Sequence, residues 1–233
     1  MIDKFQREIM LVGEENFSKI NNSSVLVVGL GGVGSAAVEA LARAGVSTIG
    51  VLDYDIVDVT NINRQLIALN STIGMKKTQV IKNRILDINE KANVITYDIR
   101  LTKENISQIS NYKYDYIIDA IDMVTSKIEL IKYASENNIG IISSMGTGKK
   151  INPLGFKVDK IKNTKGCPLA RVMRKKLGEL GIKNVKVLYS EEKAFMPDVE
   201  KLRMPSSISF VPPVCGMILA SEVIKSIIND CKL

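Results

Sequence analysis

Residues 53–65, DYDIVDVTNINRQ, form the densest group of side chains in this sequence that could bind a phosphorylated ligand. They include three aspartates, two asparagines and Arg64, and they follow an apolar run at Thr48–Leu52. Such a run predicts a buried strand, and open α/β sheets bind ligands at the carboxyl ends of their parallel strands. The segment therefore predicts a binding loop, and the alternative is a surface loop rich in turn-forming residues.

A glycine-rich turn, GLGGVG at residues 29–34, supplies a second part of such a site. It follows an apolar run at Val25–Val28 and precedes an alanine-rich amphipathic segment at Ser35–Ala44. Glycine permits a tight turn and lets backbone N–H groups approach a phosphate at the positive end of the helix. Asp53 then stands where an acidic residue binds a ribose hydroxyl. The pattern predicts a nucleotide site, for which NAD is the first alternative.

Two further charged residues lie where they could contact a nucleotide. Lys77 falls in the first turn of a helix predicted at 76–88, where a cation opposes the helix dipole, and this indicates a nearby anion or simply a solvated lysine. Asp122 follows a strand predicted at Tyr114–Ile118. It could hold Mg²⁺ bridged to a triphosphate, or cap the helix predicted at 125–137, or do both.

The sequence contains no histidine and has three widely spaced cysteines, Cys167, Cys215 and Cys231. These features exclude Ser-His-Asp and Cys-His catalysis, histidine-ligated metals and a zinc site built from CxxC pairs. The odd number of cysteines argues against a disulfide framework and predicts a cytoplasmic protein. No apolar run reaches the roughly 18 residues that span a membrane, so we expect no membrane partner.

Positive charge is concentrated in one third of the chain. The net charge is +7, and residues 149–205 carry 15 Lys and Arg against 6 Asp and Glu, whereas the remainder carries 17 against 19. This asymmetry predicts a polyanionic partner such as a nucleic acid, and the alternative is a solvated lysine-rich surface. The candidate contacts are Lys149, Lys150, Arg171, Arg174, Lys175 and Lys176, the last four on a helix predicted at Pro168–Leu180.

The alternation of strands and helices predicts a Rossmann-like α/β fold, with a mostly parallel sheet, helices on both faces and a mixed C-terminal extension. We expect a single domain: a helical arm at 1–22, a nucleotide-binding core at 23–148 and a basic part at 149–233. Further elements are predicted as helices at 3–20 (broken at Gly13) and 214–228, strands at 94–97, 139–143, 156–159 and 185–189, and a mobile loop at 190–209.

Four motifs in this order and spacing resemble the ThiF/MoeB superfamily of ubiquitin-activating-type adenylating enzymes: GLGGVG, LDYDIVDVTNINRQ, GMKK and DAID. The resemblance runs from Lys4 nearly to the end of the chain. Within the superfamily, the basic segment SMGTGKKINPLGFKVDKIKNTKGCPLARVMRKKL resembles the branch of tRNA threonylcarbamoyladenosine dehydratases. The resemblance implies ATP and Mg²⁺ as cofactors, a tRNA substrate and a homodimer.

The resemblance also implies a role for each residue that matches a motif. The residues implied to bind the nucleotide are Gly29, Gly31, Gly32, Gly34, Asp53, Asp55, Asn61, Asn63, Arg64, Gln65 and Lys77. Among them Asp53 would bind the ribose, and Asn61, Arg64 and Lys77 the phosphates. Asp122 would hold Mg²⁺. Arg7 matches an arginine that reaches the neighbouring subunit's site, and the implied catalytic set is Arg64, Lys77, Asp122 and Arg7.

The implied reaction is adenylation of the threonyl carboxylate of a nucleoside beside the anticodon, followed by cyclisation. The alternative is an activator of a ubiquitin-like sulfur-carrier protein, which would use a thiol at Cys167 or Cys215 and a sulfur-transfer partner. The chain has Cys167 where the dehydratase branch more commonly has aspartate, and this residue is either a cap of the basic helix or an activated thiol. The cysteine pairs that bind zinc in many activators are missing.

Overall fold

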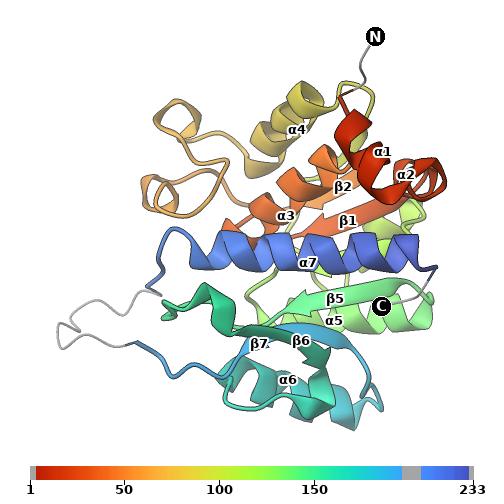
Figure 1. Ribbon diagram of the computed structural model, residues 1–233. Helices are drawn as coiled ribbons and strands as arrows, with labels where there is room; N and C mark the ends of the chain where they lie inside the picture. Colours follow the sequence, from red (N-terminus) through yellow and green to blue (C-terminus); the bar gives the residue numbers. More distant parts are fainter. Residues whose placement is uncertain (1–3, 196–205, 231–233) are drawn as a thin grey trace.

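A seven-stranded sheet with the strand order β3-β2-β1-β4-β5-β7-β6 forms the centre of the molecule (Figure 1). The structure is a computed structural model that describes residues 4–195 and 206–230. Six strands run parallel, and β6 pairs antiparallel with β7 at one edge. The strands are β1 (Ser24–Val28), β2 (Thr48–Leu52), β3 (Asn93–Tyr97), β4 (Tyr116–Asp119), β5 (Gly140–Ser144), β6 (Phe156–Lys160) and β7 (Lys186–Ser190).

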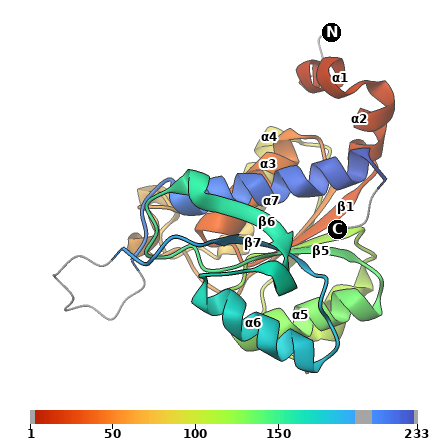
Figure 2. The same ribbon diagram turned by 60° about the horizontal axis from the view of Figure 1, so that its bottom comes forward.

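Helices cover both faces of this sheet, as Figure 2 shows. One face carries α3 (Gly32–Arg43), α4 (Lys77–Ile88) and α7 (Val211–Ile228), and the other carries α5 (Val124–Glu136) and α6 (Pro168–Glu179). Short 3₁₀ helices occupy Val59–Asn61, Asn70–Thr72, Ile106–Asn111, Pro153–Gly155 and Ile161–Asn163. The predicted fold class, a mostly parallel sheet with helices on both faces and a mixed C-terminal extension, is confirmed.

The apolar content of the central strands explains why they lie inside. Every residue of β1 (SVLVV), β2 and β5 is buried, because parallel strands with helices on both faces meet no water. Alternate residues of β1 join two separate cores: Val25 and Val27 pack towards α3 and α7, and Leu26 and Val28 towards α5 and α6. The two cores hold the carboxyl ends of β1, β2, β4 and β5 at one edge of the sheet.

Most predicted elements are confirmed within one to three residues, and the differences lie at their ends. Helix α3 begins at Gly32, inside the glycine turn, and not at Ser35. The prediction that Asp122 caps the following helix is wrong, because α5 begins after Met123 and has no side-chain cap. Cys167 does precede α6, although its side chain makes no capping hydrogen bond. Half of the predicted loop at 190–209, residues 196–205, lies outside the described residues.

Helix α7 departs from the expectation that no apolar segment reaches membrane-spanning length. It has 18 residues with a mean hydropathy of 1.6, and it is the one helix in the described chain that meets this criterion. Half of the segment is buried inside the protein, and it packs against α3 across the face of the sheet (Figure 1). Gly216 permits this close packing, because an added Cβ would stand 2.1 Å from the Val33 carbonyl oxygen. We therefore interpret α7 as a core helix.

The first two helices form an arm that lies outside the sheet. Helix α1 (Gln6–Val12) packs on α2 (Glu14–Asn21), which in turn packs against α7, and Gly13 separates the two helices as predicted. The arm lies at the end of the molecule away from the carboxyl ends of the strands (Figure 1). Met10 and Leu11 on α1 are 78% and 84% exposed. The division of the chain at residues 22 and 148 stays a prediction, although strands on both sides of residue 148 share one sheet.

Candidate active site

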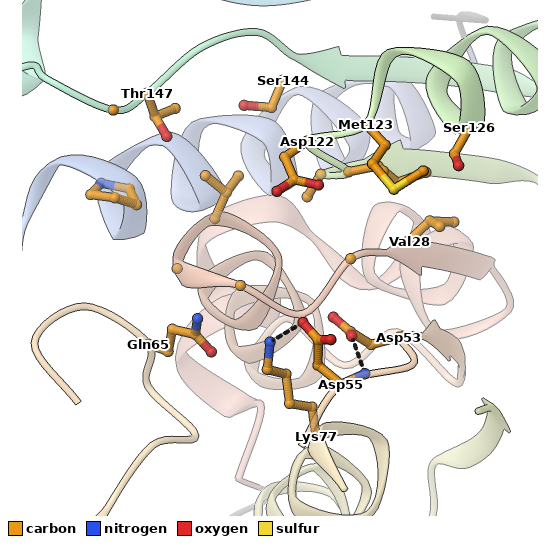
Figure 3. Close-up of a pocket in the computed structure, with 18 of the residues that line it drawn as sticks. Val28, Asp53, Asp55, Gln65, Lys77, Asp122, Met123, Ser126, Ser144 and Thr147 are labelled. Atoms are coloured by element: carbon orange, nitrogen blue, oxygen red, sulfur yellow. Dashed lines mark hydrogen bonds and ion pairs between the residues drawn. The ribbon is translucent and has the colours of Figure 1, made fainter. Parts of the chain in front are cut away.

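A pocket of about 440 Å³ opens at the carboxyl ends of the strands. The predicted nucleotide-binding residues that line it are Gly29, Gly31, Gly32, Asp53, Asp55, Asn61, Arg64, Gln65 and Lys77, and Asp122 lines it as well. The structure thus brings four separate motifs to one cavity: the glycine turn, the 53–65 loop, the GMKK segment and the DAID segment (Figure 3). Gly34, Asn63 and Arg7 are the predicted residues of this group that do not line it.

The glycines of the turn serve two different purposes. Gly29 has φ = +90°, and a Cβ there would lie 2.7 Å from the Ala120 carbonyl oxygen. Gly34 lies in α3, where a Cβ would stand 1.7 Å from the Gly29 carbonyl oxygen, so it allows the helix to pack on the turn. Gly31 caps α3 and has no atom near its missing Cβ. The turn therefore presents open backbone to the pocket at a helix N-terminus, as a phosphate site requires.

Asp53 joins the glycine turn to the 53–65 loop. Its carboxylate accepts hydrogen bonds from the backbone N–H of Leu30 at 2.6 Å and of Asp55 at 2.9 Å, one at each oxygen. The residue is 8% exposed and lines the pocket. Each carboxylate oxygen has a further lone pair, so both remain able to accept from a ribose hydroxyl. Binding to ribose stays a prediction, and the two backbone bonds add a structural role.

Lys77 is the buried cation of the pocket. It is 5% exposed, and its ammonium group lies 3.0 Å from the carboxylate of Asp55, whose side chain is 46% exposed. Figure 3 shows the pair below the glycine turn, with the lysine directed into the cavity. A buried lysine with only one carboxylate partner retains donors for an anionic ligand.

Arg64 is held by its own loop. Its guanidinium donates to the Thr60 carbonyl at 2.9 Å and to the side-chain oxygen of Asn63 at 2.8 Å. The Asn63 amide in turn donates to the Ser207 carbonyl at 3.0 Å. Asn63 therefore orients Arg64 and does not itself face the pocket. Asn61 is buried, and its side-chain oxygen accepts from the backbone N–H of Asp58 at 3.1 Å.

The surroundings of Gln65 indicate that the pocket suits a polar ligand. The residue is 6% exposed and lines the pocket, and its side-chain oxygen has no hydrogen-bond partner among the described residues. A buried amide without a partner costs about 1–3 kcal/mol, so such groups normally meet a ligand or water. The unpartnered oxygen can only accept a hydrogen bond, so it suits a hydroxyl or amino group of a nucleotide, whereas the glycine turn and Lys77 fit its phosphates.

Asp122 and Asp119 come from the same DAID motif and have opposite environments. Asp122 is exposed and points into the pocket from the side opposite Lys77 (Figure 3). Asp119 is fully buried, pairs with Lys127 at 3.0 Å and accepts from Ser143 at 2.6 Å. No three metal-binding side chains cluster within residues 4–195 and 206–230. A single free carboxylate fits Mg²⁺, which proteins hold with one or two carboxylates and substrate phosphates.

One end of the pocket is apolar and was missed by sequence reasoning. Val28 and Met123 lie there beside Ser126, away from Gln65 (Figure 3). The Arg100 guanidinium stacks over the Tyr54 ring at 5.6 Å and donates to the Met123 sulfur at 3.0 Å, so it bridges the rim of this end. An apolar slot beside Asp53 suits a nucleobase. The one signal for Arg100 was its place just beyond the carboxyl end of a predicted strand.

The predicted tRNA-binding residues differ in how far they are buried. Arg171, Lys175 and Lys176 are exposed on α6, whose opposite face is buried by Ala170, Met173 and Leu177. Arg174 is half-buried and donates to the carbonyl of Thr164 at 2.6 Å, which is a structural contact.

Lys150 and Lys149 also differ from the exposed helical group. Lys150 is 7% exposed and its ammonium donates to the Glu192 carbonyl, so the prediction of a surface contact with tRNA does not agree with its burial. Lys149 is half-buried beside the pocket, with φ = +56°.

The two described cysteines are buried. Burial raises the pKa of the Cys215 thiol to about 12, so it stays protonated and unreactive at neutral pH. Cys167 is 4% exposed and packs at the start of α6. Cys231 lies outside the described residues.

The fold and this site fit an α/β protein that binds a nucleotide at the carboxyl ends of its strands. A family model described as "ThiF family" matches residues 5–232, and the chain belongs to that family. The resemblance that the motifs predicted is therefore confirmed.

Comparison with known proteins shows which members of the family the chain is similar to. The chain is 40% identical to a Bacillus subtilis tRNA threonylcarbamoyladenosine dehydratase, over 100% of the chain and 98% of that protein. It is 39% identical to the Escherichia coli dehydratase over 75% of the chain and 65% of that protein. A solved structure of the E. coli dehydratase TcdA in complex with AMP matches 99% of the chain and 98% of its own, at 32% identity and a TM-score of 0.90.

Proposed function

We propose that this protein is an ATP-dependent tRNA threonylcarbamoyladenosine dehydratase, which adenylates the threonyl carboxylate and then cyclises the modification. The observation that carries the proposal is a single pocket that joins a phosphate-binding glycine turn to Arg64, Lys77 and Asp122. Similarity over the full length to a dehydratase supports the same activity. Solved TcdA structures in complex with AMP and with ATP support the nucleotide.

In the first step the threonyl carboxylate attacks the α-phosphorus of ATP. A bond forms between a carboxylate oxygen and phosphorus, and the bond to pyrophosphate breaks. Negative charge grows on the phosphate oxygens, and Arg64 and Lys77 stabilise it because they stand fixed in a partly dehydrated pocket. The backbone at the N-terminus of α3 holds the phosphates, and the Gln65 side-chain oxygen accepts from a hydroxyl or amino group of the nucleotide.

In the second step the ureido group of the same nucleoside attacks the activated acyl carbon, and AMP leaves. The nucleoside loses one water in total while ATP becomes AMP and pyrophosphate. Because this attack is intramolecular, correct orientation supplies much of the rate and no enzyme nucleophile is needed. The absence of histidine and the burial of Cys167 and Cys215 are compatible with such chemistry.

Three finer assignments belong to this proposal. Asp122 would hold Mg²⁺, which neutralises charge on the triphosphate when it is bound. The protein would form a homodimer in which Arg7 serves the neighbouring site, since α1 is exposed and lies far from this chain's own pocket. A cytoplasmic location is supported by the use of tRNA and ATP.

A sulfur-carrier activator is the second candidate, and the choice of acceptor tests it. The chain is 37% identical to an Aedes aegypti adenylyltransferase and sulfurtransferase, but only over 54% of the chain and 29% of that protein. Pyrophosphate and AMP formation would be measured with modified tRNA, unmodified tRNA or a ubiquitin-like protein. We expect AMP only with modified tRNA. Turnover only with the ubiquitin-like protein would reject the dehydratase and support the activator.

The exposed cations of α6 give a second test of the tRNA substrate. Lys175→Glu with Lys176→Glu should weaken tRNA binding and lower its log–log salt dependence by about one for each lost phosphate contact, with ATP affinity unchanged. The matched control is Lys91→Glu with Lys113→Glu, which makes the same charge change at exposed positions before β3 and β4. Equal tRNA affinity in both variants would remove α6 from the interface.

A further inference from the structure

One wall of the pocket takes no part in the nucleotide-binding constellation. It consists of residues 144–148, which follow β5, and residues 206–207, which precede α7. Figure 3 shows Ser144 and Thr147 of this wall on the side opposite Lys77. A nucleotide bound over the glycine turn would lie between Lys77 and this wall, and the wall therefore faces whatever reacts with the nucleotide.

Ser207 carries a buried hydroxyl that lacks a partner. Within the described chain, only the Gln65 side-chain oxygen and the Ser207 Oγ are buried without a hydrogen bond, and both residues line the same pocket. Buried hydroxyls nearly always have a partner, because desolvation is otherwise uncompensated. The two atoms therefore mark two places in the cavity where a ligand supplies the missing bonds.

The backbone of this segment is held from two sides. The Asn63 amide donates to the Ser207 carbonyl at 3.0 Å, and the Lys149 N–H donates to the Ser206 carbonyl at 2.9 Å. Asn63 also accepts from Arg64 at 2.8 Å. Ser207 is thus coupled through one side chain to the arginine that faces the phosphates.

The same wall is continuous with the basic helix. An added Cβ at Gly146 would lie 3.8 Å from the Cys167 sulfur, so the 146–148 turn packs on the start of α6, and Leu169 of α6 lines the pocket. The exposed cations of α6 lie along the helix that begins there. A nucleoside whose tRNA lies on α6 would enter over this turn and reach Ser207 last.

We propose that Ser207 binds the threonyl carboxylate of the tRNA nucleoside and positions it beside Arg64 for attack on the α-phosphorus. The inference rests on the proposed function and names the part of the site that receives the acceptor. The Ser207 hydroxyl donates to one carboxylate oxygen and leaves the other free to attack. The hydrogen bond from the Asn63 amide to the Ser207 carbonyl fixes the position of the Ser207 hydroxyl relative to Arg64.

The test compares Ser207→Ala with Ser209→Ala, an exposed serine two residues further on. Loss of a hydrogen bond to a charged group should lower kcat/KM for modified tRNA about ten- to hundred-fold. ATP affinity without tRNA should stay unchanged, and Ser207→Thr should recover part of the activity. In an Asn63→Ala background, Ser207→Ala should cost less than it does in the wild type, because the two residues act together.

The alternatives give distinct results. Equal loss of ATP affinity in Ser207→Ala would place the hydroxyl on the nucleotide and overturn the inference. Activity equal to that of Ser209→Ala would overturn it as well. A wild-type protein that binds ATP but leaves modified tRNA unchanged would overturn the proposed function together with this inference, whereas an active wild type with an active Ser207→Ala variant would overturn the role of Ser207 alone.

Discussion

Two aspartate–lysine pairs lie at the same edge of the sheet, with the same 3.0 Å separation and different surroundings. Asp119 and Lys127 are both 0% exposed. Asp55 and Lys77 line the pocket, where the lysine side chain is 6% and the carboxylate 46% exposed. The distance between the two charged groups therefore does not distinguish a structural pair from a pair that a ligand can reach. The exposure of the pair to the pocket does distinguish them.

The partners of each carboxylate explain the difference. Asp119 also accepts from the Ser143 hydroxyl at 2.6 Å and from the Ile121 N–H at 3.1 Å, so it fixes the turn that leads to Asp122. A buried charge of this kind is stable only while every partner is present. The Asp55 side chain is 46% exposed, so we expect it to return to water if a phosphate binds Lys77, and we call Asp55–Lys77 the open pair.

Breaking the buried pair should have the largest effect on folding. Lys127→Met leaves the Asp119 carboxylate buried without its counter-charge, which typically costs about 3–5 kcal/mol of unfolding free energy. Urea unfolding followed by circular dichroism would measure the change. A loss below about 1 kcal/mol would show that the pair is not the structural element inferred from its burial.

Breaking the open pair should affect the reaction and not the fold. Lys77→Met removes one donor to the phosphates, and we expect a fall in turnover of about 10²–10³-fold with little change in melting temperature. Lys76→Met is the matched control, since Lys76 is exposed and pairs with Asp98 at 2.8 Å. If both variants kept full turnover, Lys77 would have no role in phosphate binding.

Removing both charges of the Asp119–Lys127 pair shows whether the loss of stability comes from an uncompensated buried charge. Asp119→Asn with Lys127→Met removes both charges together, and the asparagine oxygen still accepts from Ile121. We expect the double variant to be more stable than Lys127→Met alone and within roughly 1–2 kcal/mol of the wild type. A double variant as unstable as the single one would mean that shape, and not charge, sets the cost.

The smallest expected effect belongs to Asp98, an exposed carboxylate that directly follows β3 and contacts the start of α4. Hydrogen bonds from the Lys76 ammonium and the Thr78 hydroxyl lower the pKa of Asp98 below its usual 3.8. The stabilisation is therefore complete above the unfolded-state pKa and is lost as the pH falls through the folded-state value. Asp98→Asn should cost under about 1 kcal/mol at pH 7, and this difference should vanish in acid. A difference that persisted at pH 2 would contradict the assignment.

Local patterns predicted the fold and the parts of the site that lie within single motifs. The β-branched runs placed β1 and β2, and glycine spacing placed the turn before α3. The position of Lys77 in the first turn of a helix left a nearby anion and a solvated lysine both open, and only the family resemblance assigned it to the phosphates.

Contacts between distant segments could not be predicted in this way. The link from Asn63 to Ser207 spans 144 residues, and the burial of Lys150 depends on the Glu192 carbonyl. No local pattern separates Lys150, which is buried, from Lys149 before it. Asp119 and Asp122 likewise look equivalent in the motif, and their roles are separated by the contacts of Asp119 with Lys127 on α5 and Ser143 on β5.

The most direct test of the proposed dehydratase activity is the mass of the tRNA nucleosides after incubation of the protein with threonylcarbamoyl-modified tRNA, ATP and Mg²⁺. We expect the loss of one water from that nucleoside, dependent on ATP and abolished by Asp122→Ala. An unchanged nucleoside mass, with wild-type protein that is folded and binds ATP, would contradict it.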